Sequence, residues 1–350
     1  MSRDGAIEPV AAEECRSILH YLRGEKDVWK RDLLLADFAN KVDALSPGLA
    51  DAMRELAIRS CLPQQGPRPE IGKILREDTR APKLVDVVIT TVTPLEWRAA
   101  RNVFAVDEDS LQVHNGRLYY QLKLPCRAAQ RDLEVVITSI MRPLNVRATK
   151  ALSEIRHYFQ GRIYFLLGIA AGRQGRVELG DVVIPEEVLY YPPGRRRPEG
   201  TEPRNPHKEV PEAVQRLVNY YEPEQTGFYD CLAAGIRGFA TGDLPDGLDD
   251  SHRPSILANN VVLASGEELI QDGLLSDLFK TEERVAAGDE EGFGFAEGVG
   301  DSPWAIFRGI SDYGVDPKPN NWQYVAVYAA GLALRDYIEN DFDVPGSETF

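Results

Sequence analysis

The sequence predicts an α/β protein with a mixed central sheet flanked by helices, preceded by a small all-α helical bundle. In the larger part of the chain, short apolar runs typical of buried strands alternate with segments of helical periodicity, as in α/β sheets. Residues 1–62 show helical patterns alone, and the proline-rich segment 63–83 follows them. We therefore predict a bundle at 1–62, a linker at 63–83, an α/β domain at 84–340 and a flexible tail at 341–350.

The composition favours a globular protein with a substantial core. The chain has 350 residues, is 43% hydrophobic and has a net charge of −15, which disfavours a broad surface for nucleic acid. It contains no apolar run long enough to span a membrane and no signal-peptide core. The four cysteines and five histidines are dispersed, so we predict no metal or cofactor and a cytoplasmic location.

The helical bundle has the features of an adaptor. Apolar residues recur at helical spacing, and Ser46-Pro47 is a helix-start signal. A bundle of roughly 60 residues is marginally stable alone but common beside a larger domain. We expect it to recruit a protein partner that regulates the α/β domain.

The α/β domain begins with the apolar run Val85–Val92, then a short loop Thr93–Glu96 and a helix from Trp97 to Phe104. Further strands are predicted at Leu118–Leu124, Leu133–Ile140, Arg162–Ala170, Gly180–Ile184 and Ser255–Ala264. Further helices are predicted at Asn145–Phe159, Glu212–Tyr221, Leu269–Leu278 and Asn321–Asn340, and residues 192–208 are predicted to be a polar, mobile loop.

The stretch Trp304–Gly314 is the strongest candidate for part of a functional site. It is predicted to be a strand from Trp304 to Arg308 that ends in a small-residue turn and presents Asp312. An acidic cluster, Gly288–Gly294, precedes it in the chain. We expect the rest of the domain to bring other groups to these two segments.

With these segments in order, residues 84–340 resemble the nucleoside phosphorylase/nucleosidase superfamily, and especially its methylthioadenosine/S-adenosylhomocysteine nucleosidases. Any one of the matching segments is weak evidence, but together and in this order they are fairly specific. The segments are Ile89–Glu96, Leu167–Gly172 with Leu179–Val183, Ala264–Glu267, Asp289–Gly292, and Arg308–Asp312 followed by Trp322.

The resemblance implies a role for each acidic residue. Asp312 would be the general acid at purine N7, oriented by Ser311, while an oxocarbenium-like ribosyl cation develops. Glu291 would accept hydrogen bonds from the ribose 2′- and 3′-hydroxyls, with Asp289 nearby. Glu96 would position the attacking water, and a carboxylate there favours hydrolysis over phosphorolysis.

The resemblance also implies a base-binding surface. Leu269 and Ile270 would stack on the base, with Ala170, Ala171 and Gly172 opposite them. Family members usually have a glycine-rich turn after the strand that corresponds to Val135–Ile140, whereas this chain has Ser139–Arg147. Arg142 and Arg147 are therefore candidates for binding a phosphorylated substrate such as ATP or AMP.

Each of these residues also has an ordinary structural explanation. Asp312 fits a turn, the acidic cluster fits a solvated charge run, and Glu96 fits the first turn of a helix. The apolar residues fit a core, and the arginines fit a surface.

We predict a purine, adenine-type N-ribosyl hydrolase that serves as a signalling or defence effector and forms a dimer or higher homo-oligomer. The alternatives are a phosphorolytic enzyme of the same fold and a non-catalytic nucleotide-sensing module.

Overall fold

A computed structural model describes most of the chain beyond residue 80. The described residues are Cys15, Ile18, 81–191, 194–197, 200–203, 205–238, 245, 248, 251–267, 278, 282–315 and 322–342. The chain separates into two compact units, Met1–Asp78 and Thr79–Phe350. Of the predicted bundle, only Cys15 and Ile18 are described, and both are helical and buried. The bundle and the linker therefore stay predictions.

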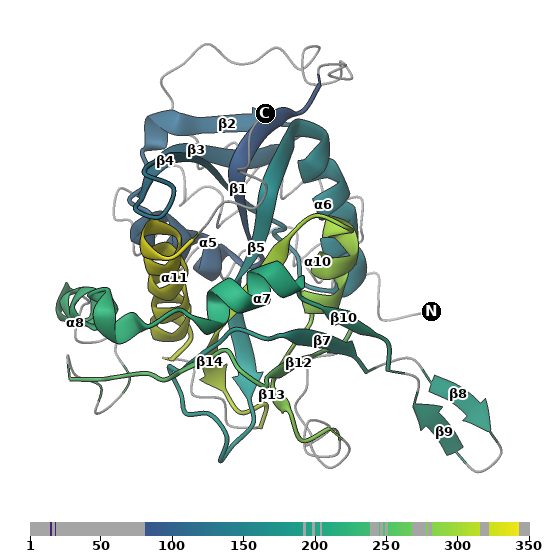
Figure 1. The fold of residues 1–350 in the computed structure, drawn as a ribbon. Helices are drawn as coiled ribbons and strands as arrows, with labels where there is room; N and C mark the ends of the chain where they lie inside the picture. Colours follow the sequence, from purple (N-terminus) through teal and green to yellow (C-terminus); the bar gives the residue numbers. More distant parts are fainter. Residues whose placement is uncertain are drawn as a thin grey trace. The chain divides into compact units, whose positions relative to one another are not determined.

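A mixed sheet forms the centre of the second unit (Figure 1). Nine of its twelve strands run in the order β10-β7-β12-β13-β5-β1-β4-β3-β2, while β14 pairs with β5 and β6, and β11 with β6. The strands are β1 (Lys83–Thr91), β2 (Leu111–His114), β3 (Arg117–Cys126), β4 (Arg131–Ser139), β5 (Phe159–Gly172), β6 (Val182–Val183), β7 (Glu187–Tyr190), β10 (His207–Glu209), β11 (Ile256–Leu257), β12 (Val262–Ser265), β13 (Val285–Asp289) and β14 (Trp304–Asp312). A separate pair is formed by β8 (Gly194–Arg197) and β9 (Gly200–Pro203).

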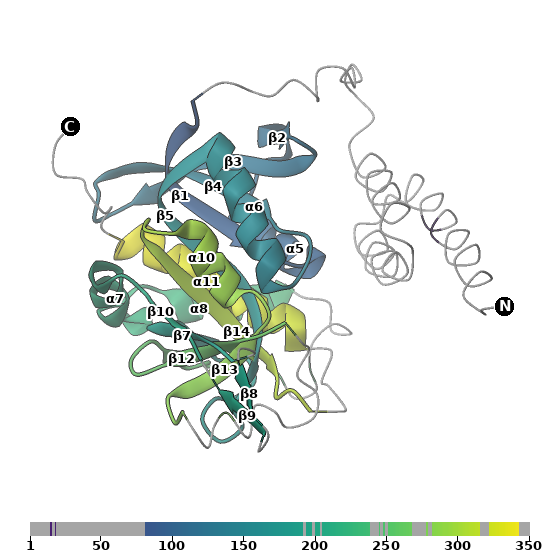
Figure 2. The same cartoon turned by 90° about the vertical axis from the view of Figure 1, so that its right-hand side faces the viewer.

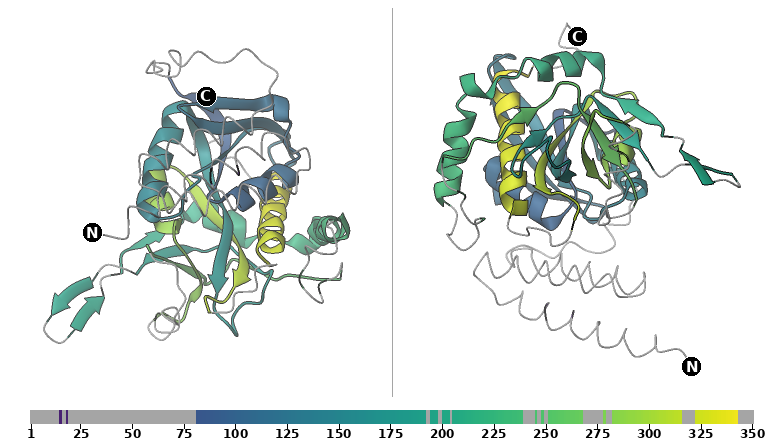
Figure 3. Two further views of the ribbon diagram at one scale, coloured as in Figure 1. Left: turned by 180° about the vertical axis from the view of Figure 1, so that it is seen from behind. Right: turned by 90° about the horizontal axis from the view of Figure 1, so that it is seen from below.

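Helices cover both faces of this sheet. They are α5 (Pro94–Val103), α6 (Asn145–Tyr158), α7 (Glu212–Asn219), α8 (Phe228–Gly238), α10 (Gly292–Val299) and α11 (Trp322–Asn340), with the short 3-10 helices Glu108–Ser110 and Pro223–Gln225. The helices α6 and α10 lie side by side on one face (Figure 2). The other face carries α5 and α11, as the view from below shows (Figure 3). Within the described residues, no helix combines the length and apolar character needed to cross a bilayer.

The long strand β5 organises the sheet. Its first part pairs with β1 in parallel, its other edge pairs with β14 in parallel, and its last residues, Ala171 and Gly172, pair with β13 in antiparallel fashion. Strand β4 is also parallel to β1. Because carboxyl ends of parallel strands meet at one edge of a sheet, the segments after β1, β4, β5 and β14 converge there.

The predicted α/β architecture, a mixed central sheet flanked by helices, is confirmed, and the main apolar runs are strands of that sheet. Four details were wrong. Strand β14 continues to Asp312, so Ser311 and Asp312 belong to a strand and not to a turn. The predicted strand Ser255–Ala264 is split into β11 and β12. Part of the predicted loop 192–208 forms β8, β9 and the edge strand β10.

The fourth error concerns the predicted tail at 341–350. Phe342 is fully buried, and its carbonyl oxygen accepts a hydrogen bond from the thiol of Cys126 at 3.2 Å. The folded domain therefore extends at least to residue 342. Residues 343–350 lie outside the described part of the chain.

The ion pair between Asp86, near the start of β1, and Arg131 makes a testable contribution to stability. The Asp86 carboxylate accepts hydrogen bonds from Arg131 at 2.8 and 2.6 Å and from the Glu134 amide at 2.9 Å. Burial raises the pKa of Asp86, but these bonds and the charges of Arg131 and Arg162 outweigh burial and lower it below its ordinary range. A lowered carboxyl pKa stabilises the fold above the unfolded-state pKa of about 4, and this contribution is lost as pH falls.

We expect Asp86→Asn to lower the free energy of unfolding by about 1–2 kcal/mol at pH 7, a range discounted for the half-exposed Arg131. Urea unfolding of both proteins at pH 7 and pH 3 measures it. The difference should shrink at pH 3, whereas an equal difference at both pH values would contradict the assignment.

Candidate active site

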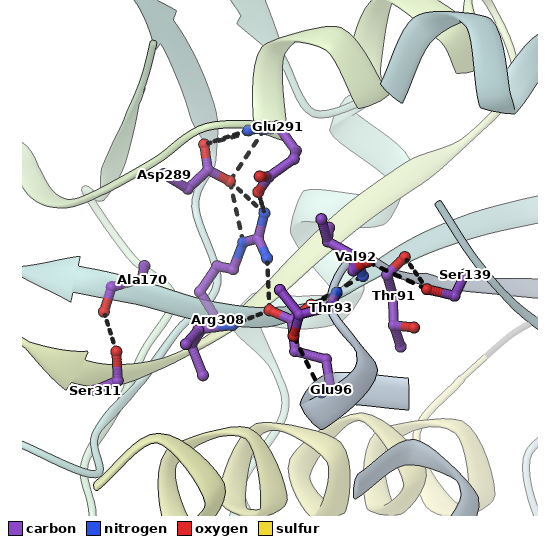
Figure 4. Close-up of polar contacts among 12 residues, drawn as sticks. Thr91, Val92, Thr93, Glu96, Ser139, Ala170, Asp289, Glu291, Arg308 and Ser311 are labelled. Atoms are coloured by element: carbon purple, nitrogen blue, oxygen red, sulfur yellow. Dashed lines mark hydrogen bonds and ion pairs between the residues drawn. The ribbon is translucent and has the colours of Figure 1, made fainter. Parts of the chain in front are cut away.

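Arg308 lies at the centre of the candidate site. It is in the middle of β14, is fully buried, and its guanidinium faces the carboxylates of Glu96, Asp289 and Glu291 (Figure 4). Arg308 Nε donates to Asp289 Oδ2 at 3.0 Å, and Nη2 donates to Glu291 Oε2 at 3.0 Å. Nη1 lies 3.6 Å from Glu96 Oε1 and has no hydrogen-bond partner in the described part of the chain.

The three carboxylates keep this buried guanidinium charged. Burial lowers the pKa of Arg308, but the negative charges of Asp289, Glu291 and Glu96 outweigh it and raise that pKa above its ordinary value. Gly168 of β5 leaves the space that the side chains of Arg308 and Glu96 occupy. A Cβ at this position would lie 2.0 Å from Arg308 Nη1 and 2.3 Å from Glu96 Oε1. The space above Gly168 is therefore filled by protein side chains.

Glu96 is held by backbone amides as well as by Arg308. It lies in the first turn of α5, which starts at Pro94, three positions before the helix start predicted at Trp97. Thr93 and Glu96 form a capping box, in which Glu96 Oε2 accepts from the amides of Val92 and Thr93, each at 2.8 Å. Its Oε1 accepts from the Ile169 amide of β5 at 2.9 Å. Glu96 thus has the structural role of a first-turn acid that caps α5. In addition, its Oε1 lies 3.6 Å from Arg308 Nη1.

Asp289 and Glu291 lie where β13 leads into α10. Asp289 ends β13, and Glu291 occupies the N-cap position of α10. Both are buried, so they are not a solvated charge run. Burial raises the pKa of Glu291 to about 8, because removal from water outweighs the attraction of Arg308, and the charges of Asp289 and Glu96 add to the rise.

Asp312 lies at the carboxyl end of β14 and is nearly buried. Its Oδ2 accepts a hydrogen bond from Ser311 Oγ at 2.9 Å, and its Oδ1 accepts from the Gly314 amide at 2.8 Å. The register of β14 against β5 shifts between Ile310 and Asp312. Ser311 is the extra residue at this shift, since Ile310 pairs with Ala170 and Asp312 pairs with Ala171. The Ser311 hydroxyl makes the contact expected of an orienting residue.

The remaining predicted site residues fall into three groups. Ala170, Ala171 and Gly172 form the end of β5, where a Cβ on Gly172 would lie 2.6 Å from the side chains of Ile310 and Val177. Gly172 is thus required for packing, whatever else it does. Leu269 and Ile270 lie outside the described residues.

Arg142 and Arg147 flank the start of α6. Arg142 is half-buried in the loop between β4 and α6, and Arg147 is exposed in the first turn of the helix. Two non-glycine residues of this loop have positive φ angles, which such residues rarely adopt: Met141 at 60° and Leu144 at 93°. This loop, which contains no glycine, therefore has a strained backbone.

Sequence reasoning assigned no role to Arg308, Asn145 or Ser265. A signal for Arg308 was available, because a charged residue inside the apolar strand Trp304–Ile310 requires buried carboxylate partners. Asn145 and Ser265 gave no such signal, since single polar residues next to apolar runs are common. Among the described residues, no group of His, Cys, Asp and Glu is arranged to hold a metal ion.

The raised pKa of Glu291 predicts that the ligand-free protein loses stability as pH rises. A raised carboxyl pKa gives a contribution that is complete below the unfolded-state pKa of about 4 and is lost as pH rises through the folded-state value of about 8. We expect the free energy of unfolding to fall between pH 5 and pH 9. The Glu291→Gln variant should show a flatter profile in urea titrations, and identical profiles would contradict the assignment.

Solved structures of other proteins share the fold of this domain. Futalosine hydrolase of Helicobacter pylori strain 26695 superposes with a TM-score of 0.51 at 13% identity, covering 73% of this chain and 97% of its own. The 5′-methylthioadenosine/S-adenosylhomocysteine nucleosidase of Neisseria meningitidis, in complex with methylthio-immucillin-A, gives 0.51 at 15% identity, covering 73% and 98%. The domain thus has the nucleosidase fold, as the predicted resemblance requires.

The chain is also similar in sequence to a curated nucleosidase. The chain is 25% identical over 288 residues to the ATP nucleosidase Cap17 of Escherichia coli strain KTE188, which covers 77% of this chain and 54% of that protein. The chain thus spans about half the length of the curated relatives that it matches. No family model matches the chain.

Proposed function

We propose that the chain is a hydrolase of the N-glycosidic bond that releases a purine base, with adenine preferred, from a nucleoside or 5′-nucleotide. The observation that supports this most strongly is the placement of Asp312 and the Arg308-centred carboxylates on β14 and the segments around it. The nucleosidase fold and the likeness to an ATP nucleosidase agree with it.

The proposed chemistry follows from these side chains. Asp312, held by Ser311 and the Gly314 amide, donates a proton to the departing base at purine N7. Glu291, held by Arg308, accepts hydrogen bonds from the ribose 2′- and 3′-hydroxyls in its deprotonated form, which its pKa of about 8 makes the minor form at pH 7. Positive charge that develops on the ribosyl group is stabilised by the neighbouring carboxylates.

Glu96 and Arg308 are proposed to hold the attacking water. Glu96 Oε1 is an acceptor, and Arg308 Nη1 is a buried donor 3.6 Å from it that makes no hydrogen bond to the described residues. Water needs both kinds of partner to be oriented. An inorganic phosphate ion would be repelled by the carboxylates of Glu96, Asp289 and Glu291, which favours hydrolysis over phosphorolysis.

The same repulsion applies to the triphosphate of ATP. If ATP is the substrate, its phosphates must lie away from the carboxylates and near cationic groups. Arg142 and Arg147, beside the start of α6, are the candidates for this role. ATP is the first substrate to test because of the curated relative.

The experiment is base release, followed by chromatography, from adenosine, methylthioadenosine, S-adenosylhomocysteine, AMP, ATP, inosine and guanosine. Wild-type protein is compared with Arg142→Ala and Arg147→Ala, and with Lys123→Ala, an exposed lysine on β3, as the charge control. A higher KM for ATP but not for adenosine in an arginine variant supports a phosphate contact. Release from none of these substrates would favour the nucleotide-sensing alternative.

Regulation and assembly belong to the same proposal. We keep the expectations that the N-terminal region recruits a protein partner and that the chain forms a homo-oligomer. Activity of the full chain compared with residues 79–350 tests the first, and light scattering tests the second.

A further inference from the structure

The first turn of α10 is capped in an unusual way. The first amides of a helix have no partner within it, and the side chain of the N-cap residue normally accepts from one of them. In α10 the N-cap residue is Glu291, and its side chain makes no capping hydrogen bond.

Three residues outside the helix accept from these amides. The Gly292 amide donates to the Asp289 carboxylate at 3.0 Å, the Phe293 amide to Ser265 Oγ at 3.2 Å, and the Gly294 amide to Asn145 Oδ1 at 2.6 Å. Asp289 ends β13, Ser265 ends β12, and Asn145 begins α6. The cap therefore comes from three separate elements.

Asn145 uses its whole amide group in this contact. Its Oδ1 also accepts from Ser265 Oγ at 3.1 Å, and its Nδ2 donates to the Gly266 carbonyl at 2.7 Å. Asn145 and Ser265 are both buried. The absence of a Cβ on Gly294 is required, because that atom would lie 2.0 Å from the Asn145 carbonyl oxygen.

Because residues outside α10 accept from its first amides, these amides are not available to the Glu291 carboxylate. The positive end of a helix attracts a carboxylate, and the amides of Phe293 and Gly294 would be its nearest donors. Both are occupied by Ser265 and Asn145, and the carboxylate instead lies 3.0 Å from Arg308.

We propose that Asn145 and Ser265 are positioning residues, which cap α10 in place of Glu291 and so hold the Glu291 carboxylate beside Arg308 for the ribose hydroxyls. The inference rests on the proposed function for its catalytic consequence. Its structural part, the orientation of the Glu291 side chain, can be tested without any measurement of enzymatic activity.

The test compares Asn145→Ala and the milder Ser265→Ala with Thr149→Val as a matched control. Thr149 is on the same helix and donates to the Gly294 carbonyl at 2.9 Å, so it contacts α10 without capping its amides. The activity readout is the ratio of kcat/KM for ATP to that for 2′-deoxy-ATP. We expect this ratio to fall about tenfold in Asn145→Ala, less in Ser265→Ala, and by less than about twofold in Thr149→Val. Equal losses for both sugars in all three variants would overturn the proposal.

A readout that needs no substrate separates this proposal from the proposed function. Carbon-13 NMR titration of the Glu291 carboxyl should give a pKa near 8 in the wild type and in Thr149→Val. In Asn145→Ala the carboxylate should turn to the free amides, and its pKa should fall toward the ordinary range. An unchanged Glu291 pKa in both capping variants would overturn the positioning role even if the wild type is active. If the wild type shows no activity but the Glu291 pKa is lowered in Asn145→Ala relative to the wild type, the positioning role stands and the hydrolase is rejected.

Discussion

Asn in place of Asp312 should lower the rate of base release by about two to four orders of magnitude, the usual contribution of a general acid. An amide has nearly the shape of a carboxylate and can keep the contacts with Ser311 and Gly314, but it has no acidic proton to donate to purine N7. Steady-state base release by the purified variant measures the effect. Its unfolding curve should stay close to that of the wild type.

Ser311→Ala is the matched variant for this prediction. It removes the 2.9 Å hydrogen bond to Asp312 while keeping the acid, so we expect a loss of about tenfold. If Asp312→Asn retains more than about a tenth of the wild-type rate, a contribution below that usual range, Asp312 is not the general acid.

Removal of the charge of Arg308 should damage the fold as well as the activity. Arg308→Met leaves three buried carboxylates without their cation, and breaking a buried ion pair in this way costs about 3–5 kcal/mol. The loss should be larger at pH 8 than at pH 5, because protonated carboxyl groups no longer repel one another. Urea unfolding at the two pH values measures it.

Two further variants make this prediction specific. Arg308→Lys keeps a positive charge without the forked geometry and should lose less stability than Arg308→Met. Arg101→Met removes a half-buried arginine whose guanidinium lies over the Tyr120 ring, and should cost only about 1 kcal/mol. If Arg308→Met and Arg101→Met are equally stable at pH 8, the Arg308 cluster does not stabilise the fold as argued.

Local features of the site were predictable from the sequence. The segment Thr93–Glu96 has the spacing of a capping box, and the apolar runs that became β1, β4 and β5 are typical of buried parallel strands. These patterns depend on neighbouring residues alone. They place Glu96 correctly after the buried strand β1, whereas Asp312 lies inside β14 and not in the turn that the sequence predicts.

Features that depend on distant contacts were not predictable. The sequence predicts a turn from Gly309, but the missing Cβ of this residue allows close packing, since that atom would lie 1.9 Å from the Ala326 carbonyl oxygen. The strand therefore runs on to Asp312. The break between β11 and β12 has a local cause, because Asn260, between the two strands, adopts a positive φ of 57°.

The carboxylates around Arg308 and the cap of α10 join residues that are far apart in the chain. Asn145 and Gly294, for example, meet only because α6 and α10 pack side by side. A single sequence contains no signal for such a pair. The family resemblance identified the acids but gave no information on how this chain holds them.

The most direct test of the central claim is the identity of the sugar product formed from ATP by the 350-residue chain in phosphate-free buffer. Hydrolysis predicts equimolar adenine and ribose 5-triphosphate, detected by mass spectrometry, with a rate that added phosphate does not raise. Formation of a sugar 1-phosphate that requires added phosphate would contradict the account, since it would mean that phosphate and not water attacks beside Glu96 and Arg308.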